Sequence, residues 1–130
     1  MKWSHIALMA GGAAGVAARA IISHWLEAKT GHHLPWGTIF VNVSGCFLIG
    51  FLSGLTAPAG VLPAHPVLRD ALLVGVLGGY TTFSSFSLQT VHLLNEGRFF
   101  DAFGHVFATV AFCLLATWLG LRLAPHPIAS

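Results

Sequence analysis

The sequence predicts an all-α membrane protein in which a single domain, residues 1–130, consists of four transmembrane helices. The chain is 55% hydrophobic and only 8% charged, whereas roughly 25% of the residues in a soluble globular domain are charged. Its apolar residues also gather in four runs, each as long as the ~20 residues that cross a hydrocarbon core. These runs cover residues 4–26, 36–57, 67–94 and 99–123.

A short polar loop separates the first two predicted helices. The loop EAKTGHHLP interrupts the apolar pattern and ends at Pro35, which favours the start of a new helix. The second helix then opens with WGTIFVNVSGCFLIGFLSG, in which Trp36 marks the membrane interface and Asn42 stands inside the span. Almost no part of this half of the chain is left for a soluble domain.

The third predicted helix contains a break. It follows the proline-rich turn APAGVLPAHP and meets Gly78 and Gly79 within the span. A double glycine is where a membrane helix can unwind and expose carbonyl oxygens, and broken helices at mid-membrane recur as ion sites. A cation bound there would be structural, because it satisfies carbonyls that lipid leaves without partners. The sequence NEGR then ends the helix with a glycine C-cap signal, before the fourth helix begins.

Small residues four positions apart occur in three of the predicted helices. Such pairs let helix backbones approach closely in lipid. Four short helices barely enclose a pathway, so the pattern favours tight packing within an oligomer. The pairs are Gly11 and Gly15, Gly50 and Gly54, and Gly75 and Gly79.

Positive charges are nearly balanced between the two sides of the membrane. The side of both termini carries Lys2, Arg69 and Arg122, and the opposite side carries Lys29 and Arg98, with Arg19 near the end of the first helix. This distribution gives no clear orientation under the positive-inside rule. Two explanations stay open: insertion in both orientations as an antiparallel homodimer, or a weak bias that is read by other means.

The residues that are missing exclude several classes of function. Asp and Glu occur only near helix ends, whereas a proton-coupled transporter needs a titrating carboxylate inside the membrane. A small dual-topology multidrug or cation transporter is therefore only the alternative hypothesis. The sequence also lacks the phosphate-binding loop, serine elbow and HExxH motifs of enzymes, and its net charge of +2 comes without a basic cluster. We expect neither an enzyme nor a nucleic-acid-binding protein.

A polar stripe follows the double glycine. At ~100° per residue, Thr82, Ser85, Phe86 and Gln89 share one face of a helix, and Phe83 borders it. Polar groups in a span must face protein or water. The edge of a phenyl ring is positive, so ring edges along a narrow path can help a small anion to lose its water. The alternative is that both phenylalanines are core or lipid-facing residues.

Other polar side chains within the spans allow two interpretations each. Asn42 either forms an interhelical hydrogen bond or offers its amide to an ion path. Arg19 either extends to the interface or attracts anions to a vestibule. Thr109 adds a hydroxyl. Cys46 and Cys113 fall within spans and resemble neither a disulfide framework nor a metal motif, so Cys46 is interpreted as a packing residue.

Three motifs, in this order, resemble those of the CrcB/Fluc family of fluoride channels along nearly the whole chain. They are GGAAGVAAR in the first helix, GTIFVNVSGCFLIG in the second and GVLGGYTTFSSFS in the third. The resemblance implies a dual-topology antiparallel homodimer with two antiparallel fluoride pores and a central structural sodium ion at the dimer interface. It also implies a multi-pass protein of a prokaryotic plasma or inner membrane that exports cytoplasmic fluoride. The choice of fluoride over chloride rests on this resemblance.

The resemblance further implies roles for individual residues. Asn42 matches the pore asparagine, and Phe83 and Phe86 match a phenylalanine pair to which both subunits contribute. Thr82 and Ser85 match the hydroxyl track, and Arg19 matches the vestibule arginine. Gly78 and Thr81 match the positions whose backbone carbonyls bind sodium.

The chain departs from the family pattern at two places. Gln89 stands where members often have Glu. In the fourth helix, His105, Thr109 and Cys113 stand where members often have a tyrosine and the serines that follow it. Thr109 keeps a hydroxyl that can face the pore, whereas Cys113 is a weak donor.

Overall fold

The computed structural model describes residues 2–125, and these residues form helices joined by short turns. Four helical stretches within this range are long and apolar enough to cross a membrane, which confirms the predicted class. The helices are α1 (Trp3–Thr30), α2 (Trp36–Leu55), α3 (Pro66–Asp70), η1 (Ala71–Val76), α4 (Leu77–Tyr80), α5 (Phe83–Asn95) and α6 (Phe99–Leu123). The third span, Pro66–Asn95, therefore consists of α3, η1, α4 and α5 in succession.

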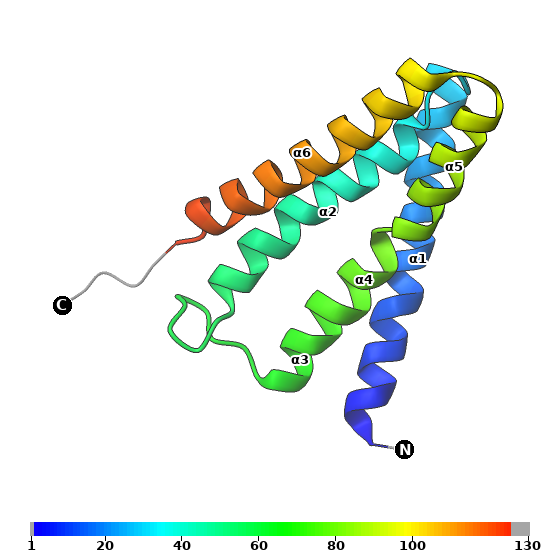
Figure 1. Cartoon of the computed structure of the whole chain (residues 1–130). Coiled ribbons are helices and arrows are strands. Elements are labelled where there is room, and N and C mark those ends of the chain that lie inside the picture. The colour runs from blue at the N-terminus through cyan, green and yellow to red at the C-terminus, as the bar shows by residue number, and fades with distance from the viewer. Residues whose placement is uncertain (1, 126–130) are drawn as a thin grey trace.

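The helices form two pairs that meet at one end and spread apart toward the other (Figure 1). One pair is α2 and α6, which lie side by side along most of their length, and in the other pair α1 packs against η1 and α4. The third span connects the two pairs, because α4 packs against α1 whereas α5 packs against α6. The point at which the third span passes from one pair to the other is its break.

Glycines allow the paired helices to approach to backbone contact. A Cβ added at Gly15 of α1 would overlap the carbonyl of Val76 in η1, and one added at Gly79 would lie 2.5 Å from the Gly12 carbonyl oxygen. In the other pair, a Cβ at Gly50 of α2 would overlap the carbonyl of Thr117 in α6. Every glycine of the three predicted pairs lies at such a contact except Gly54, which meets the Ala124 side chain, so the expectation of tight helix packing is confirmed.

The break in the third span is confirmed, but the prediction that the helix unwinds at the double glycine is wrong. Gly78 and Gly79 remain helical in α4, and the chain becomes extended at Thr81 (ψ 160°) and Thr82 (φ −151°, ψ 111°). The backbone of Gly79 is held against α1. Helix α4 ends at Tyr80, the next residue, because a side chain of α2 takes the Thr82 N–H away from the helical pattern. The break therefore lies where a competing acceptor is available, and not where intrinsic helix propensity is lowest.

Arg19 lies deep within α1 and not near its end, contrary to the prediction. The helix extends beyond the apolar run as far as Thr30. Its polar last turns are supported by Lys29, whose Nζ lies 4.6 Å from the centre of the Trp25 ring. Arg19 Nη1 contacts the Thr81 carbonyl, so Arg19 lies at the depth of the break in the third span.

Candidate functional site

Asn42 holds the break in place through two hydrogen bonds to one residue. The Thr82 N–H donates to Asn42 Oδ1 over 2.7 Å, and Asn42 Nδ2 donates to the Thr82 carbonyl over 3.1 Å. Both residues are buried, so each backbone group would otherwise be unsatisfied within the membrane. An asparagine amide carries two N–H donors, and this arrangement uses only one. Asn42 therefore both fixes the break and retains a donor.

Thr82 also begins the helix that follows the break. Its Oγ1 accepts from the Ser85 N–H over 3.3 Å and lies 3.0 Å from Ser85 Oγ. Thr82 is thus the N-cap of α5. Helix α5 therefore presents its N-terminal N–H groups, the positive end of its dipole, in the middle of a membrane span. Because Thr82 precedes α5, the predicted helical face includes only Ser85, Phe86 and Gln89.

Arg19 points at the break and not toward the membrane interface. Its Nη1 donates to the Thr81 carbonyl over 3.2 Å, and the residue is half-buried. Across residues 2–125, no carboxylate lies within ion-pair distance of Arg19. The guanidinium therefore brings an uncompensated positive charge to the middle of the third span.

The break leaves the carbonyl of Gly78 free. In a continuous helix this carbonyl would accept from the Thr82 N–H, which instead donates to Asn42. Among the described residues, no other backbone or side-chain donor takes its place. Gly78 is exposed on the single chain, and a Cβ added there would meet open space.

A groove of about 290 Å³ lies beside the break. Its walls come from α2, α5 and α6 and from the extended residues between α4 and α5. Phe83 is 76% exposed at its rim, whereas Phe86 is 7% exposed, and their ring centres lie 5.3 Å apart with planes tilted by 54°. The lining residues are Asn42, Cys46, Thr81, Thr82, Phe83, Phe86, Thr109, Val110, Cys113 and Leu114.

Most of the predicted site residues meet at this groove. Asn42, Thr82, Phe83, Phe86 and Thr109 all line it. Two others reach it through a neighbour, since Ser85 contacts Thr82 and Arg19 contacts Thr81. Gly78 is absent from the lining. Of the two predicted sodium ligands, only Thr81 lines the groove.

The residues of α6 and Cys46 are less predictable from the sequence. His105 is 2% exposed and lies behind Phe86, with the two ring centres 5.0 Å apart. Its Nδ1 lies 3.5 Å from Thr109 Oγ1, and its Nε2 has no partner among the described residues. The i, i+4 spacing of His105 and Thr109 was the available signal. Cys46, interpreted from the sequence as a packing residue, lines the groove.

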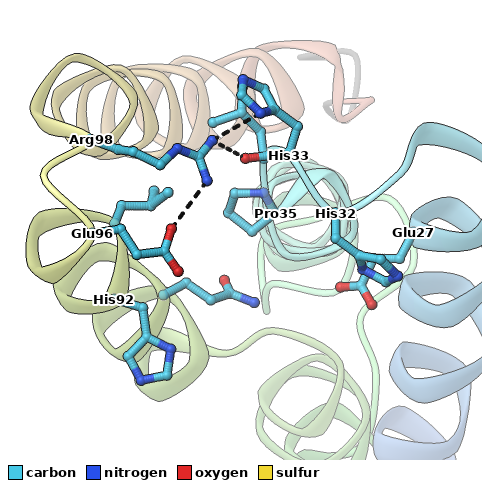
Figure 2. Close-up of a pocket in the computed structure, with 10 residues that line it drawn as sticks. Glu27, His32, His33, Pro35, His92, Glu96 and Arg98 are labelled. Atoms are coloured by element: carbon cyan, nitrogen blue, oxygen red, sulfur yellow. Dashed lines mark hydrogen bonds and ion pairs between the residues drawn. The ribbon is translucent and has the colours of Figure 1, made fainter.

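A second pocket, of about 190 Å³, lies at the end where the helix pairs meet (Figure 2). Arg98 is central to it. It donates to the His33 carbonyl, to Glu96 Oε2 over 3.4 Å and to Asp101 Oδ2 over 2.9 Å. Gln89, one turn of α5 beyond Phe86, also lines this end pocket, and its Oε1 is buried without a partner within residues 2–125. The end pocket is polar, but its arginine is neutralised by carboxylates.

Known proteins resemble this chain along almost its whole length. The family described as CrcB-like protein, Camphor Resistance (CrcB), matches residues 6–121. A relative from Methylocella silvestris named fluoride-specific ion channel FluC is 46% identical over 113 residues, which are 87% of this chain and 86% of the relative. Proteins of the same name from Opitutus terrae and Rhizobium meliloti are 47% and 44% identical, covering 85% and 92% of this chain and 83% and 95% of the relatives. The chain belongs to the CrcB family.

Proposed function

We propose that this protein is a fluoride-selective ion channel that exports cytoplasmic fluoride across a bacterial membrane. Several relatives that are 44–47% identical over most of their length carry the name fluoride-specific ion channel. The four apolar spans make the chain a multi-pass membrane protein, and its function is conduction rather than catalysis.

The helix break at mid-membrane is the observation that best supports anion conduction. Three kinds of positive group converge there: the N-terminus of α5, the amide of Asn42 and the guanidinium of Arg19. Among the residues that the structure describes, no acidic side chain lines the groove beside them. Helix N-termini and guanidinium groups favour anions, and the absence of a carboxylate from the groove removes the repulsion that would exclude them.

The geometry of the groove suggests how a fluoride ion passes. A small anion keeps its water until donors replace it, and the groove offers amide and hydroxyl donors from Asn42, Thr82 and Thr109. The tilted rings of Phe83 and Phe86 add positive edges between these donors. Each contact is neutral, so it helps dehydration without forming a deep trap, and conduction needs binding that is weak enough to release the ion.

A second copy of the chain, inverted in the membrane, would complete the pore. The carbonyl of Gly78 has no donor from the described residues, although lipid cannot satisfy it. Phe83 projects from the chain at 76% exposure, and the nearly balanced end charges set no orientation. An antiparallel homodimer covers the exposed backbone of Gly78 and lets the Phe83 of each copy line a pore.

The dimer is tested by labelling from each side of the membrane. A single cysteine replacing Lys2, in a chain whose two native cysteines are serine, should react with an impermeant reagent on both sides of the membrane. Labelling from one side only would contradict dual topology without affecting the assignment of fluoride conduction.

The residues at the break fit a structural sodium ion at the interface. The Gly78 carbonyl has no donor within residues 2–125, and the Thr81 carbonyl, which accepts from Arg19, has a second lone pair. No group of three or more His, Cys, Asp or Glu side chains among the described residues is placed to hold a metal, so backbone oxygens are the ligands that remain. Sodium bound to Gly78 and Thr81 of both copies would satisfy the Gly78 carbonyl and use the second lone pair of the Thr81 carbonyl.

Flux under controlled gradients tests both the function and the role of sodium. Liposomes containing the purified protein should release fluoride much faster than chloride at matched loading, with no proton gradient and with equal sodium on both sides. Equal release of the two anions would contradict fluoride selectivity. Flux that follows an imposed proton or sodium gradient would indicate a coupled transporter instead of a channel.

A further inference from the structure

The two cysteines of the chain lie opposite each other in the groove. Cys46 is on α2 and Cys113 is on α6, and both line the groove beside the break. Their alignment is fixed by backbone packing one helical turn further along. There, the missing side chain of Gly50 lets α2 rest on the Thr117 carbonyl of α6. One turn in the other direction, Asn42 and Thr109 also line the groove together.

Both thiols open onto the same groove, one from each of two packed helices. Each residue is partly exposed, and the two are not joined by a disulfide. Two adjacent free thiols that open onto the proposed anion path form a site that the conduction mechanism does not use.

We propose that Cys46 and Cys113 together bind a soft, thiophilic metal cation of the Hg²⁺, Ag⁺ or Cu⁺ class, and that a cation held there blocks the groove. Thiolates select such soft metals over the harder cations, which need oxygen or nitrogen ligands. These soft cations accept linear coordination by two sulfurs, and two facing thiols supply it.

Binding requires no oxidant or reductant. Each thiol loses its proton, two sulfur–metal bonds form, and Hg²⁺ becomes a neutral dithiolate while two protons pass to water. The filled site lies between α2 and α6, beside Phe86 and Thr109. The metal therefore occupies space through which, under the proposed function, a partly dehydrated anion passes.

Metal binding is measured first, because it is independent of fluoride conduction. Purified full-length protein should bind one Hg²⁺ per chain, with the ultraviolet absorption of a mercury–thiolate bond, and an excess of a small dithiol should remove the metal. Cys46→Ser and Cys113→Ser should each weaken binding by at least about a hundredfold, because one thiolate replaces two. The corresponding alanine variants and the elution profile of each protein check that the changes leave the fold intact.

The single-cysteine variants decide between a shared site and two separate thiols. If each variant still binds one Hg²⁺ as tightly as the wild type, or if the wild type binds two, the paired site is disproved.

Block of conduction is measured second, and it rests on the proposed function. Hg²⁺ should stop fluoride efflux from liposomes that contain the wild-type protein. It should leave unchanged the efflux through the double serine variant, when each protein is compared with its own rate without Hg²⁺. Tight paired binding without block would refute only the claim that the site closes the path. Absence of fluoride efflux from untreated wild type would instead count against the proposed function and leave the binding result intact.

Discussion

Two arginines occupy opposite kinds of environment in this protein. Arg98, at the end where the helix pairs meet, contacts Glu96 and Asp101 and donates to the His33 carbonyl. Arg19, at the break, donates to one backbone carbonyl and has no carboxylate within reach in the part of the chain that the structure describes. The two arginines therefore have different roles. The neutralised charge of Arg98 links a loop to a helix end, whereas the uncompensated charge of Arg19 gives the break a positive potential.

The contrast extends to the surroundings of each arginine. The end pocket contains charged groups of both signs, and its half-buried Arg98 lies between the half-buried Asp101 and the exposed Glu96. The groove at the break contains neutral amides, hydroxyls and aromatic rings, and its charge comes from Arg19 and the start of α5. The groove at the break therefore attracts an anion, whereas the positive charge in the end pocket is already neutralised by carboxylates.

Replacement of Asn42 should have the largest effect on conduction. Asn42→Asp keeps an acceptor for the Thr82 N–H, but it leaves the Thr82 carbonyl without a donor and adds a negative charge to the groove. A buried unsatisfied group alone costs about 1–3 kcal/mol, and about 1.4 kcal/mol added to a barrier slows passage tenfold. We expect fluoride efflux to fall by at least about a hundredfold.

A matched asparagine serves as the control. Asn95 ends α5 and is exposed, so Asn95→Asp adds the same charge away from the groove and should conduct normally. Normal efflux in a well-folded Asn42→Asp protein would remove Asn42 from the path and leave it as a structural bridge.

Loss of the groove aromatics should have the next largest effect. Phe83→Ile and Phe86→Ile preserve most of the hydrophobic volume but remove the positive ring edges. We expect each variant to assemble normally and to conduct at least about tenfold less fluoride. Phe100, which is 94% exposed at the start of α6, provides a matched Phe→Ile control that should not alter efflux. Wild-type efflux in both groove variants would make these rings packing residues.

The cap of α5 should have a smaller effect. Thr82→Val removes the hydroxyl that accepts from the Ser85 N–H, and loss of such a cap costs about 1 kcal/mol. We expect efflux to fall a few-fold and thermal stability to decrease, while Thr82→Ser restores both. Thr90→Val is the control, because that hydroxyl bonds only to the Phe86 carbonyl of its own helix. If the two valine variants behave alike, the cap plays no special part at the break.

Much of this architecture could be predicted from the sequence because lipid imposes simple requirements. Apolar length marks the spans, and small residues at helical spacing mark the close contacts, such as that between Gly15 and Val76. The double glycine also predicts that the third span is broken. Local composition does not predict where the break lies, because its position depends on Asn42, which is forty residues away in the chain.

The depth of individual side chains was harder to predict. The sequence predicts Arg19 near a helix end because the apolar run stops at residue 26, whereas α1 continues to Thr30. The relation of His105 to Phe86 depends on how α5 docks against α6 after the break. Neither position can be derived from periodicity alone, since both follow from packing between distant segments.

The most direct test of the account is the fluoride efflux of Arg19→Gln measured beside that of Arg98→Gln, at equal amounts of folded protein in liposomes. Both changes remove one positive charge and keep hydrogen-bond donors. If the break is the anion path, Arg19→Gln should lose at least about tenfold in rate, and Arg98→Gln should stay within about twofold of the wild type. Equal losses in the two variants, or normal efflux in Arg19→Gln, would contradict the claim that the uncompensated charge at the break attracts the anion.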